Sequence, residues 1–173
     1  MAVHFGSTGS NLATGLFALM PSYVTQNETE TRELGRRLGE QLQPGTVIGL
    51  SGTLGAGKTR FVQGIGLGLG IAADSICSPT YTICVPYSGR LPLYHLDAYR
   101  IVDLAEVDEL ALDELVEEGA VVVIEWSERI SSVLPAMDLR VSIEQTSMET
   151  RVFELVVLSD RMPWFASVFP ESQ

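Results

Sequence analysis

The glycine-rich stretch GTLGAGKT, Gly52–Thr59, is the feature that most limits what this chain can fold into. Its glycines suit a tight loop in which the main chain takes conformations that other residues avoid. The apolar run Thr46–Gly52 predicts a short buried strand before the loop, and residues 58–69 predict a helix after it. A glycine loop between a strand and a helix is typical of a site where main-chain N–H groups converge on phosphates.

The stretch satisfies the phosphate-binding pattern G-x-x-x-x-G-K-[ST], and each residue type in it has a physical role. The glycines let N–H groups approach the phosphates, where the helix N-terminus adds partial positive charge. Lys58, the only lysine among 11 basic residues, supplies a compact charge that the planar guanidinium of arginine does not replace. Thr59 offers a hydroxyl to Mg²⁺. The residues predicted to bind nucleotide here are Gly52, Leu54, Gly55, Ala56, Gly57, Lys58 and Thr59.

Predicted helices and strands alternate through the first half of the chain. Residues 25–42 place leucines four residues apart on one face and begin with a capping box from Thr25 to Glu28, so a helix is predicted. The helix after the glycine loop contains further glycines, each costing roughly 1 kcal/mol against alanine, so its C-terminal half is expected to fray. Residues 80–87 and 91–97 flank a short SGR turn and predict a hairpin.

The second half continues the alternation. The acidic segment Leu104–Gly119 has apolar residues near one face and predicts a helix whose carboxylates are solvated. The continuous apolar run Ala120–Trp126 suits a strand covered on both faces, as in a parallel sheet. Residues 137–144 and 151–158 alternate between apolar and polar, which predicts an antiparallel hairpin at one edge of the sheet.

Length and element order predict a single domain of the α/β class. We expect a three-layer fold like that of P-loop NTPases, with a mostly parallel sheet, antiparallel hairpins and helices on both faces. The predicted domain covers residues 23–158, after a poorly ordered extension at 1–22. The tail at 159–173 is expected to cover the sheet with its large apolar side chains, Trp164, Phe165 and Phe169.

Charge and composition exclude several classes of function. The formal net charge of −11 opposes direct binding to a phosphate backbone and favours a basic partner protein. The apolar run at residues 12–20 is too short to span a bilayer. Cys77 and Cys84 form neither a zinc pattern nor a disulfide framework. A cytoplasmic protein with reduced thiols and no membrane partner is predicted.

A triphosphate site also needs a carboxylate at the end of a strand, to hold Mg²⁺ or to orient the attacking water. Two candidates compete, because Asp97 ends one predicted strand and Glu125 ends another. Glu125 follows the cleaner apolar run. Without the phosphate loop either acid could be an ordinary carboxylate at a strand end, but with the loop present at least one of them must serve the metal.

Four motifs together resemble a known family. They are GTLGAGKT, SPTYTICVPY at residues 78–87, YHLDAYR at 94–100, and LDELVEEGAVVVIEW at 112–126. This combination is similar to that of TsaE (YjeE), the ATPase of bacterial tRNA threonylcarbamoyladenosine biosynthesis. The resemblance covers residues 23–158 in the family's order and spacing.

The resemblance implies a partner-dependent ATPase that uses ATP and Mg²⁺. It acts with TsaB and TsaD, which modify the adenosine beside the tRNA anticodon, so tRNA is reached only through the complex. Lys58, Glu125 and Asp97 are implied to be catalytic, with Thr59 and Glu125 at the metal and Asp97 positioning water or coupling to partners. Trp126, beside Glu125, also falls on a position tied to function.

Two further implied sites flank the loop. Thr80 belongs to a switch-like segment near the γ-phosphate, and residues around Glu28 line the adenine. The chain departs from the family's pattern at Thr53, where an Asp is usual. We therefore expect any contact of that acid to be lost or replaced.

Three alternatives remain at this point. A small-molecule kinase would also use the phosphate loop, although no arginine-rich lid segment is visible. A guanine-nucleotide switch protein normally has an Asn-Lys-x-Asp motif, which this chain lacks because Lys58 is its only lysine. A module that binds ATP without hydrolysing it differs from an ATPase only in turnover.

Overall fold

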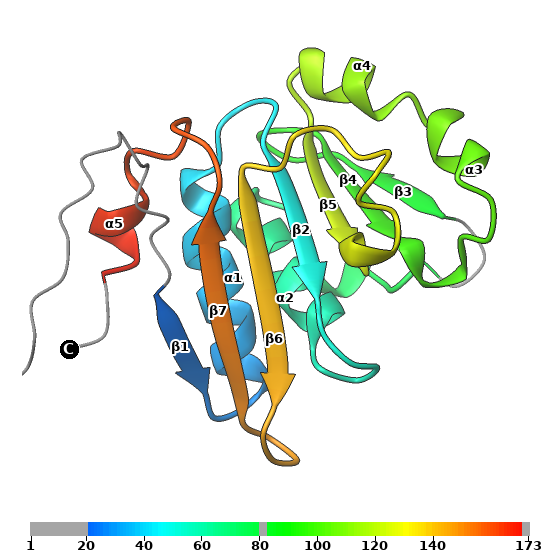
Figure 1. The fold of residues 1–173 in the computed structure, drawn as a ribbon. Coiled ribbons are helices and arrows are strands. Elements are labelled where there is room, and N and C mark those ends of the chain that lie inside the picture. The colour runs from blue at the N-terminus through cyan, green and yellow to red at the C-terminus, as the bar shows by residue number, and fades with distance from the viewer. Residues whose placement is uncertain (1–20, 80–82, 171–173) are drawn as a thin grey trace, which may run out of the picture.

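A computed structural model describes residues 21–79 and 83–170 of the chain. These residues form a seven-stranded sheet with helices on both of its faces (Figure 1). The strands are β1 (Ser22–Thr25), β2 (Val47–Ser51), β3 (Cys84–Tyr87), β4 (Leu93–Asp97), β5 (Val121–Glu125), β6 (Leu139–Gln145) and β7 (Arg151–Val157). The helices are α1 (Glu28–Gln41), α2 (Lys58–Gly68), α3 (Ala105–Asp108), α4 (Leu112–Glu117) and α5 (Phe165–Val168).

The sheet has a parallel centre and antiparallel edges. The strand order is β1-β7-β6-β2-β5-β4-β3. The neighbours β6, β2, β5 and β4 all run parallel, while β3 and the pair β7 and β1 run antiparallel to their neighbours. This arrangement confirms the predicted α/β fold class, including the hairpin of β3 with β4.

The β6–β7 hairpin forms as predicted, but its place at the edge of the sheet was wrong. β6 pairs with β2 on one side, and β1 adds a strand outside β7. Leu139, Val141 and Ile143 of β6 are all buried in the main core. The edge strand β1 occupies residues that the sequence had assigned partly to a helix.

The first helix begins later than the sequence predicted. Thr25 is a buried residue of β1, and its hydroxyl lies 2.9 Å from that of Thr31. The N-cap is Asn27, whose Oδ1 accepts a hydrogen bond from the main-chain N–H of Glu30 at 2.9 Å. The Glu30 carboxylate accepts in turn from the N–H of Gln26. The capping box is therefore shifted by two residues, because Thr25 is taken up by the sheet.

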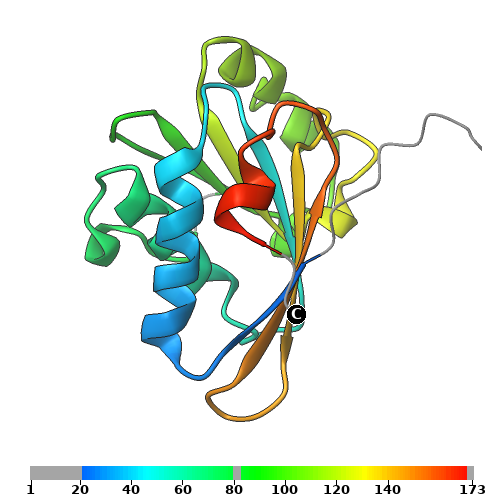
Figure 2. The ribbon, with the colours of Figure 1, turned by 90° about the vertical axis from the view of Figure 1, so that its left-hand side faces the viewer.

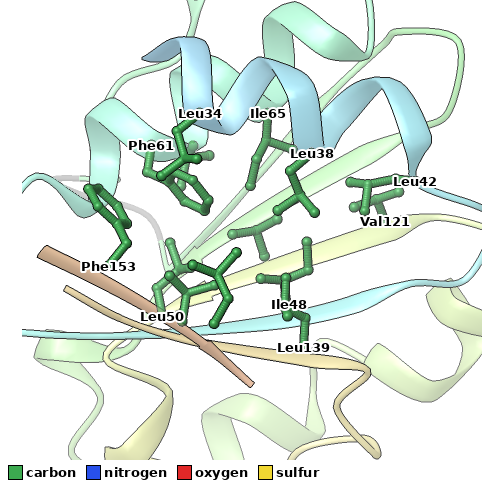
Figure 3. Close-up of a cluster of buried hydrophobic side chains, with 14 of the residues drawn as sticks. Leu34, Leu38, Leu42, Ile48, Leu50, Phe61, Ile65, Val121, Leu139 and Phe153 are labelled. Carbon is green, nitrogen blue, oxygen red and sulfur yellow. The ribbon is translucent and has the colours of Figure 1, made fainter. Parts of the chain in front are cut away.

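The main core lies between the sheet and the α1–α2 pair (Figures 2 and 3). Figure 3 shows Leu34 and Leu38 of α1, and Leu42 at its C-cap, on the side that faces Ile48 and Leu50 of β2. Phe61 of α2 packs against Phe153 of β7 with ring centroids 5.3 Å apart. The leucine face from which the helix was predicted therefore packs on the sheet.

Glycines let α1 and α2 approach each other closely. A Cβ on Gly64 would lie 2.2 Å from the Arg32 carbonyl oxygen, and one on Gly39 would lie 2.3 Å from that of Ile65. The glycines of α2 are therefore contact residues, and the helix continues to Gly68 without the expected fraying. Tertiary packing offsets their low helix propensity.

The opposite face of the sheet carries a second, smaller core. Val122 and Ile124 of β5 point into it, together with Val107 of α3 and Leu112 of α4. The acidic segment at 104–119 was predicted to form one helix. The structure shows two short helices there instead. Ala111 between them has a left-handed φ of 48°, which ends the helical path and lets both helices place a side chain against the sheet.

The C-terminal segment packs onto the main core. Phe165 and Phe169 are fully buried and stacked at 5.0 Å, and Trp164 packs against the same cluster. Their predicted role in covering the sheet is confirmed. No helix among the described residues is long and apolar enough to cross a bilayer.

We predict that Gly64→Ala lowers the free energy of unfolding by about 3 kcal/mol, because the new methyl group must displace the backbone of α1. Helix propensity alone predicts the opposite sign. Denaturant unfolding measures the change. The control is Leu67→Ala in the same helix, where the side chain is 39% exposed and a loss under about 1 kcal/mol is expected. Equal losses would contradict the close helix contact.

Candidate functional site

The glycine loop joins β2 to α2 at the carboxyl edge of the parallel strands. Gly57 is the N-cap of α2 with a φ of 104°, and Gly52 has a φ of 146°. A Cβ on Gly52 would lie 2.4 Å from the Ile143 carbonyl oxygen. Neither position tolerates a side chain, so the loop geometry explains its glycines.

A cleft of about 610 Å³ lies beside this loop. It is lined by residues from the loop, the start of α1, the segment after α2 and the ends of β4 and β5. Of the residues predicted from sequence, those that line it are Glu28, Leu54, Gly55, Ala56, Gly57, Lys58, Thr59, Asp97 and Glu125. Gly52 is not among the residues that line this cleft, and Thr80 lies outside the described residues.

Lys58 is held by its own loop. Its Nζ donates hydrogen bonds to the carbonyl oxygens of Gly52 and Thr53, at 2.8 and 2.9 Å. Burial lowers the pKa of the Lys58 ammonium, against the opposing pull of carboxylates that include Glu125. Thr53 thus contributes through its main chain, a contact that does not depend on whether its side chain is Thr or Asp.

An aromatic ring lies against the same ammonium. The Trp126 ring centroid is 3.8 Å from Lys58 Nζ, a cation–π distance. Trp126 takes a left-handed φ of 59°, which a large residue avoids unless its surroundings impose it. Tyr99 packs on Trp126 with centroids 5.0 Å apart. The strained turn after β5 therefore brings Trp126 to the wall of the cleft.

Glu125 is the acid that contacts α2, the helix that follows the glycine loop. Thr59 donates its hydroxyl hydrogen to Glu125 Oε1 at 2.8 Å. His95 Nε2 lies 2.8 Å from the same oxygen, and the His95 side chain is fully buried. Sequence reasoning did not assign His95 to the site. The spacing of two between His95 and Asp97 on β4, which puts both on one face of the sheet, is the signal that could have found it.

Asp97 sits next to Glu125, because the two residues are paired in the register of β4 and β5. Its carboxylate accepts hydrogen bonds from the main-chain N–H of Tyr99 at 3.0 Å and from the Ser78 hydroxyl at 3.2 Å. Asp97 therefore caps the turn at Ala98–Arg100 while lining the cleft. Of these two acids, Glu125 is the one hydrogen-bonded to Thr59.

Two arginines in the cleft wall are already engaged. Arg151 donates through Nε to the Ala56 carbonyl oxygen at 3.1 Å and so fixes the loop from the β7 side. Arg60 pairs with Glu28 at 3.0 Å between Nε and the carboxylate. Arg151 was not predicted, because only the fold brings β7 beside the loop.

The oxygen atoms present suit a magnesium ion that is shared with phosphate. The Thr59 hydroxyl donates a hydrogen bond to Glu125, so the lone pairs of its oxygen remain available to a cation. Both residues line the cleft. Among the described residues no group of three or more His, Cys, Asp or Glu side chains could hold a metal on its own. Mg²⁺ usually completes its shell with waters and substrate phosphates, so this limited donor set fits it.

Comparison with known proteins gives consistent matches. A sequence model of the family described as threonylcarbamoyl adenosine biosynthesis protein TsaE matches residues 25–153. The tRNA threonylcarbamoyladenosine biosynthesis protein TsaE of Treponema pallidum is 42% identical over 120 residues, 69% of this chain and 88% of that protein. The protein of the same name from Bacillus subtilis is 38% identical over 138 residues, 79% of this chain and 85% of that protein. The crystal structure of Bacillus subtilis YdiB superposes with a TM-score of 0.71 at 30% identity, covering 88% of this chain and 95% of that one.

We predict that a thiol reagent at pH 8 modifies Cys77 and spares Cys84. Cys77 is exposed in the cleft, whereas burial raises the pKa of the Cys84 thiol to about 11. Below that pKa the Cys84 sulfur stays a protonated, poorly nucleophilic thiol. Peptide mass mapping after iodoacetamide treatment measures both sites. Cys77→Ser should remove the label, and rapid labelling of Cys84 would contradict its burial.

Proposed function

The chain belongs to the TsaE family of tRNA threonylcarbamoyladenosine biosynthesis proteins, and from that premise we propose that it binds ATP and hydrolyses it with magnesium. One observation carries the proposal, the hydrogen bond from Thr59 at the start of α2 to Glu125 at the end of β5. It joins the hydroxyl and the acid that a triphosphate site requires, beside a lysine in a glycine loop.

Each group of residues in the cleft has a separate proposed role. Main-chain N–H groups of the loop and the start of α2 bind the phosphates. Lys58 exchanges its two carbonyl partners, on Gly52 and Thr53, for phosphate oxygens. Thr59 and Glu125 would hold Mg²⁺, which when bound screens the charge that develops on the transferred phosphoryl group. Asp97, which accepts hydrogen bonds from Ser78 and from the turn, would orient water.

The cation count favours hydrolysis that depends on a partner. Every Lys and Arg of the sequence falls within the described residues. Among these, the cations that line the cleft are Lys58, Arg60 and Arg151, and both arginines are already bonded to groups of the chain. Phosphoryl transfer gains greatly from an additional arginine at the transferred phosphate. The chain alone should therefore hydrolyse ATP slowly.

The same count bears on the two remaining alternatives. A metabolite kinase needs arginines that clamp both phosphates and acceptor, and the bonded state of Arg60 and Arg151 gives that reading less support. An ATP-gated module without turnover is the second candidate. It is favoured by the engaged arginines, and measured turnover separates it from the ATPase.

We propose that TsaB and TsaD are the partners, and that tRNA is reached only through them. The net charge of −11 supports a protein partner with a basic surface. The acidic segment at 104–119 is the proposed docking surface. Its exposed carboxylates include Asp108, Glu109, Asp113, Glu114, Glu117 and Glu118.

We predict Mg²⁺-dependent ATP hydrolysis that is slow for the chain alone and rises with stoichiometric TsaB and TsaD. Lys58→Ala should lower the stimulated rate by roughly 100-fold or more, because the phosphate charge loses its fixed counterion. Phosphate release measures the rate, and calorimetry with ATP measures binding. ATP binding without turnover in either condition would favour the gated module. Phosphoryl transfer to a metabolite would favour the kinase.

We predict that the triple reversal Glu109→Lys, Glu114→Lys, Glu117→Lys weakens binding to the TsaB–TsaD pair by about tenfold at low salt. The matched control reverses Glu144, Glu149 and Glu154, which are also exposed but lie on the β6–β7 hairpin. Both variants have the same net charge, so a difference between them reports location. Calorimetry or biolayer interferometry measures the affinity, and equal losses would contradict docking at residues 104–119.

A further inference from the structure

His95 is a buried polar residue that the proposed chemistry does not use. It lies at the middle of β4, in register with Val123 of β5 and Val85 of β3. Its side chain is 0% exposed. A buried histidine between two valines loses hydration, and such a loss is tolerated where the ring makes a specific hydrogen bond.

The ring makes such a contact with one nitrogen only. Nε2 lies 2.8 Å from Glu125 Oε1, while Nδ1 is buried and has no hydrogen-bond partner within the described part of the chain. A hydrogen on Nδ1 would leave an unsatisfied donor in the core and place the lone pair of Nε2 against the Glu125 carboxylate. A hydrogen on Nε2 instead donates to the Glu125 carboxylate and leaves only a lone pair at Nδ1. The geometry therefore assigns the Nε2–H tautomer.

Glu125 Oε1 then accepts two hydrogen bonds, from His95 and from Thr59. The two donors approach from different elements, β4 and the start of α2, and so restrict rotation of the carboxylate. No hydrogen bond to Oε2 is found within the described residues, and Glu125 lines the cleft. Oε2 is thus the oxygen left to face a cation or its water.

We infer that His95 is a positioning residue, which donates from Nε2 to Glu125 and holds that carboxylate in the orientation that binds magnesium with the nucleotide. This inference rests on the proposed function. His95 itself touches neither metal nor phosphate. Hydrogen-bond partners of this kind orient metal-binding side chains, and their loss commonly lowers metal affinity by roughly 10–100-fold.

The test compares His95→Gln with His95→Asn. The Gln amide nitrogen can stand near the position of Nε2, whereas the Asn amide nitrogen stands near Nδ1. Both variants replace the same buried ring with an amide, and their side chains differ by one methylene group. Thermal unfolding of both variants checks that they fold.

The first readout is the ratio of the ATP dissociation constants in EDTA and in Mg²⁺, from calorimetry on the full chain. His95→Asn should lower that ratio by about tenfold or more with the EDTA value unchanged, and His95→Gln should restore most of it. A ratio in His95→Asn equal to that of the parent would overturn the inference. So would an equal loss of affinity in both buffers, which a merely structural role predicts.

The second readout needs no nucleotide. The chain contains two histidines, so His4→Gln leaves His95 as the only imidazole in a ¹⁵N-labelled sample. Long-range ¹H–¹⁵N spectra should show the pattern of the Nε2–H tautomer, and the Nδ1–H pattern would overturn the assignment.

The calorimetry separates this inference from the proposed function. An unsubstituted chain that binds no ATP would contradict the proposed function. If the unsubstituted chain binds ATP more tightly in Mg²⁺ than in EDTA, and His95→Asn has the same ratio of dissociation constants, only the role of His95 is contradicted.

Discussion

The parallel pairing of β2 with β5 is the constraint on which the rest of the site depends. It sets Leu50 beside Glu125, so the loop that leaves β2 and the acid that ends β5 arise at the same edge of the sheet. The next parallel pair adds Asp97 beside Glu125. Three separate segments thus converge because parallel strands all present their carboxyl ends together.

The site is already internally bonded before any ligand arrives. Lys58 donates to carbonyl oxygens of its own loop, and Oε1 of Glu125 accepts from a hydroxyl and an imidazole. A phosphate bound by Lys58 would therefore displace two carbonyl oxygens from the ammonium. Such an arrangement keeps the loop ordered, and it moderates the affinity because existing bonds are lost when new ones form.

Features set by local pattern could be predicted from the sequence. The glycine loop, the buried β5 run and the β6–β7 hairpin depend on residues close together in the chain, and all form at the expected residues, although β1 lies outside the hairpin in the sheet. Features set by tertiary competition could not. Thr25 joined the sheet and left the cap to Asn27, and Ala111 broke the acidic helix so that both halves reach the sheet. Arg151 reaches the site only through the strand order, which no local pattern contains, whereas His95 lies two residues before Asp97 on the same strand.

The C-terminal segment has a practical consequence for anyone who trims this chain. The family match ends at residue 153, within β7. The residues beyond it include Phe165 and Phe169, which fill the core beside α1, and the Pro170 carbonyl oxygen accepts a hydrogen bond from Tyr23 of the edge strand. An expression boundary drawn at the end of the family match would strip the side chains that seal one end of the core. The resulting fragment would expose leucines and phenylalanines and would be prone to precipitate.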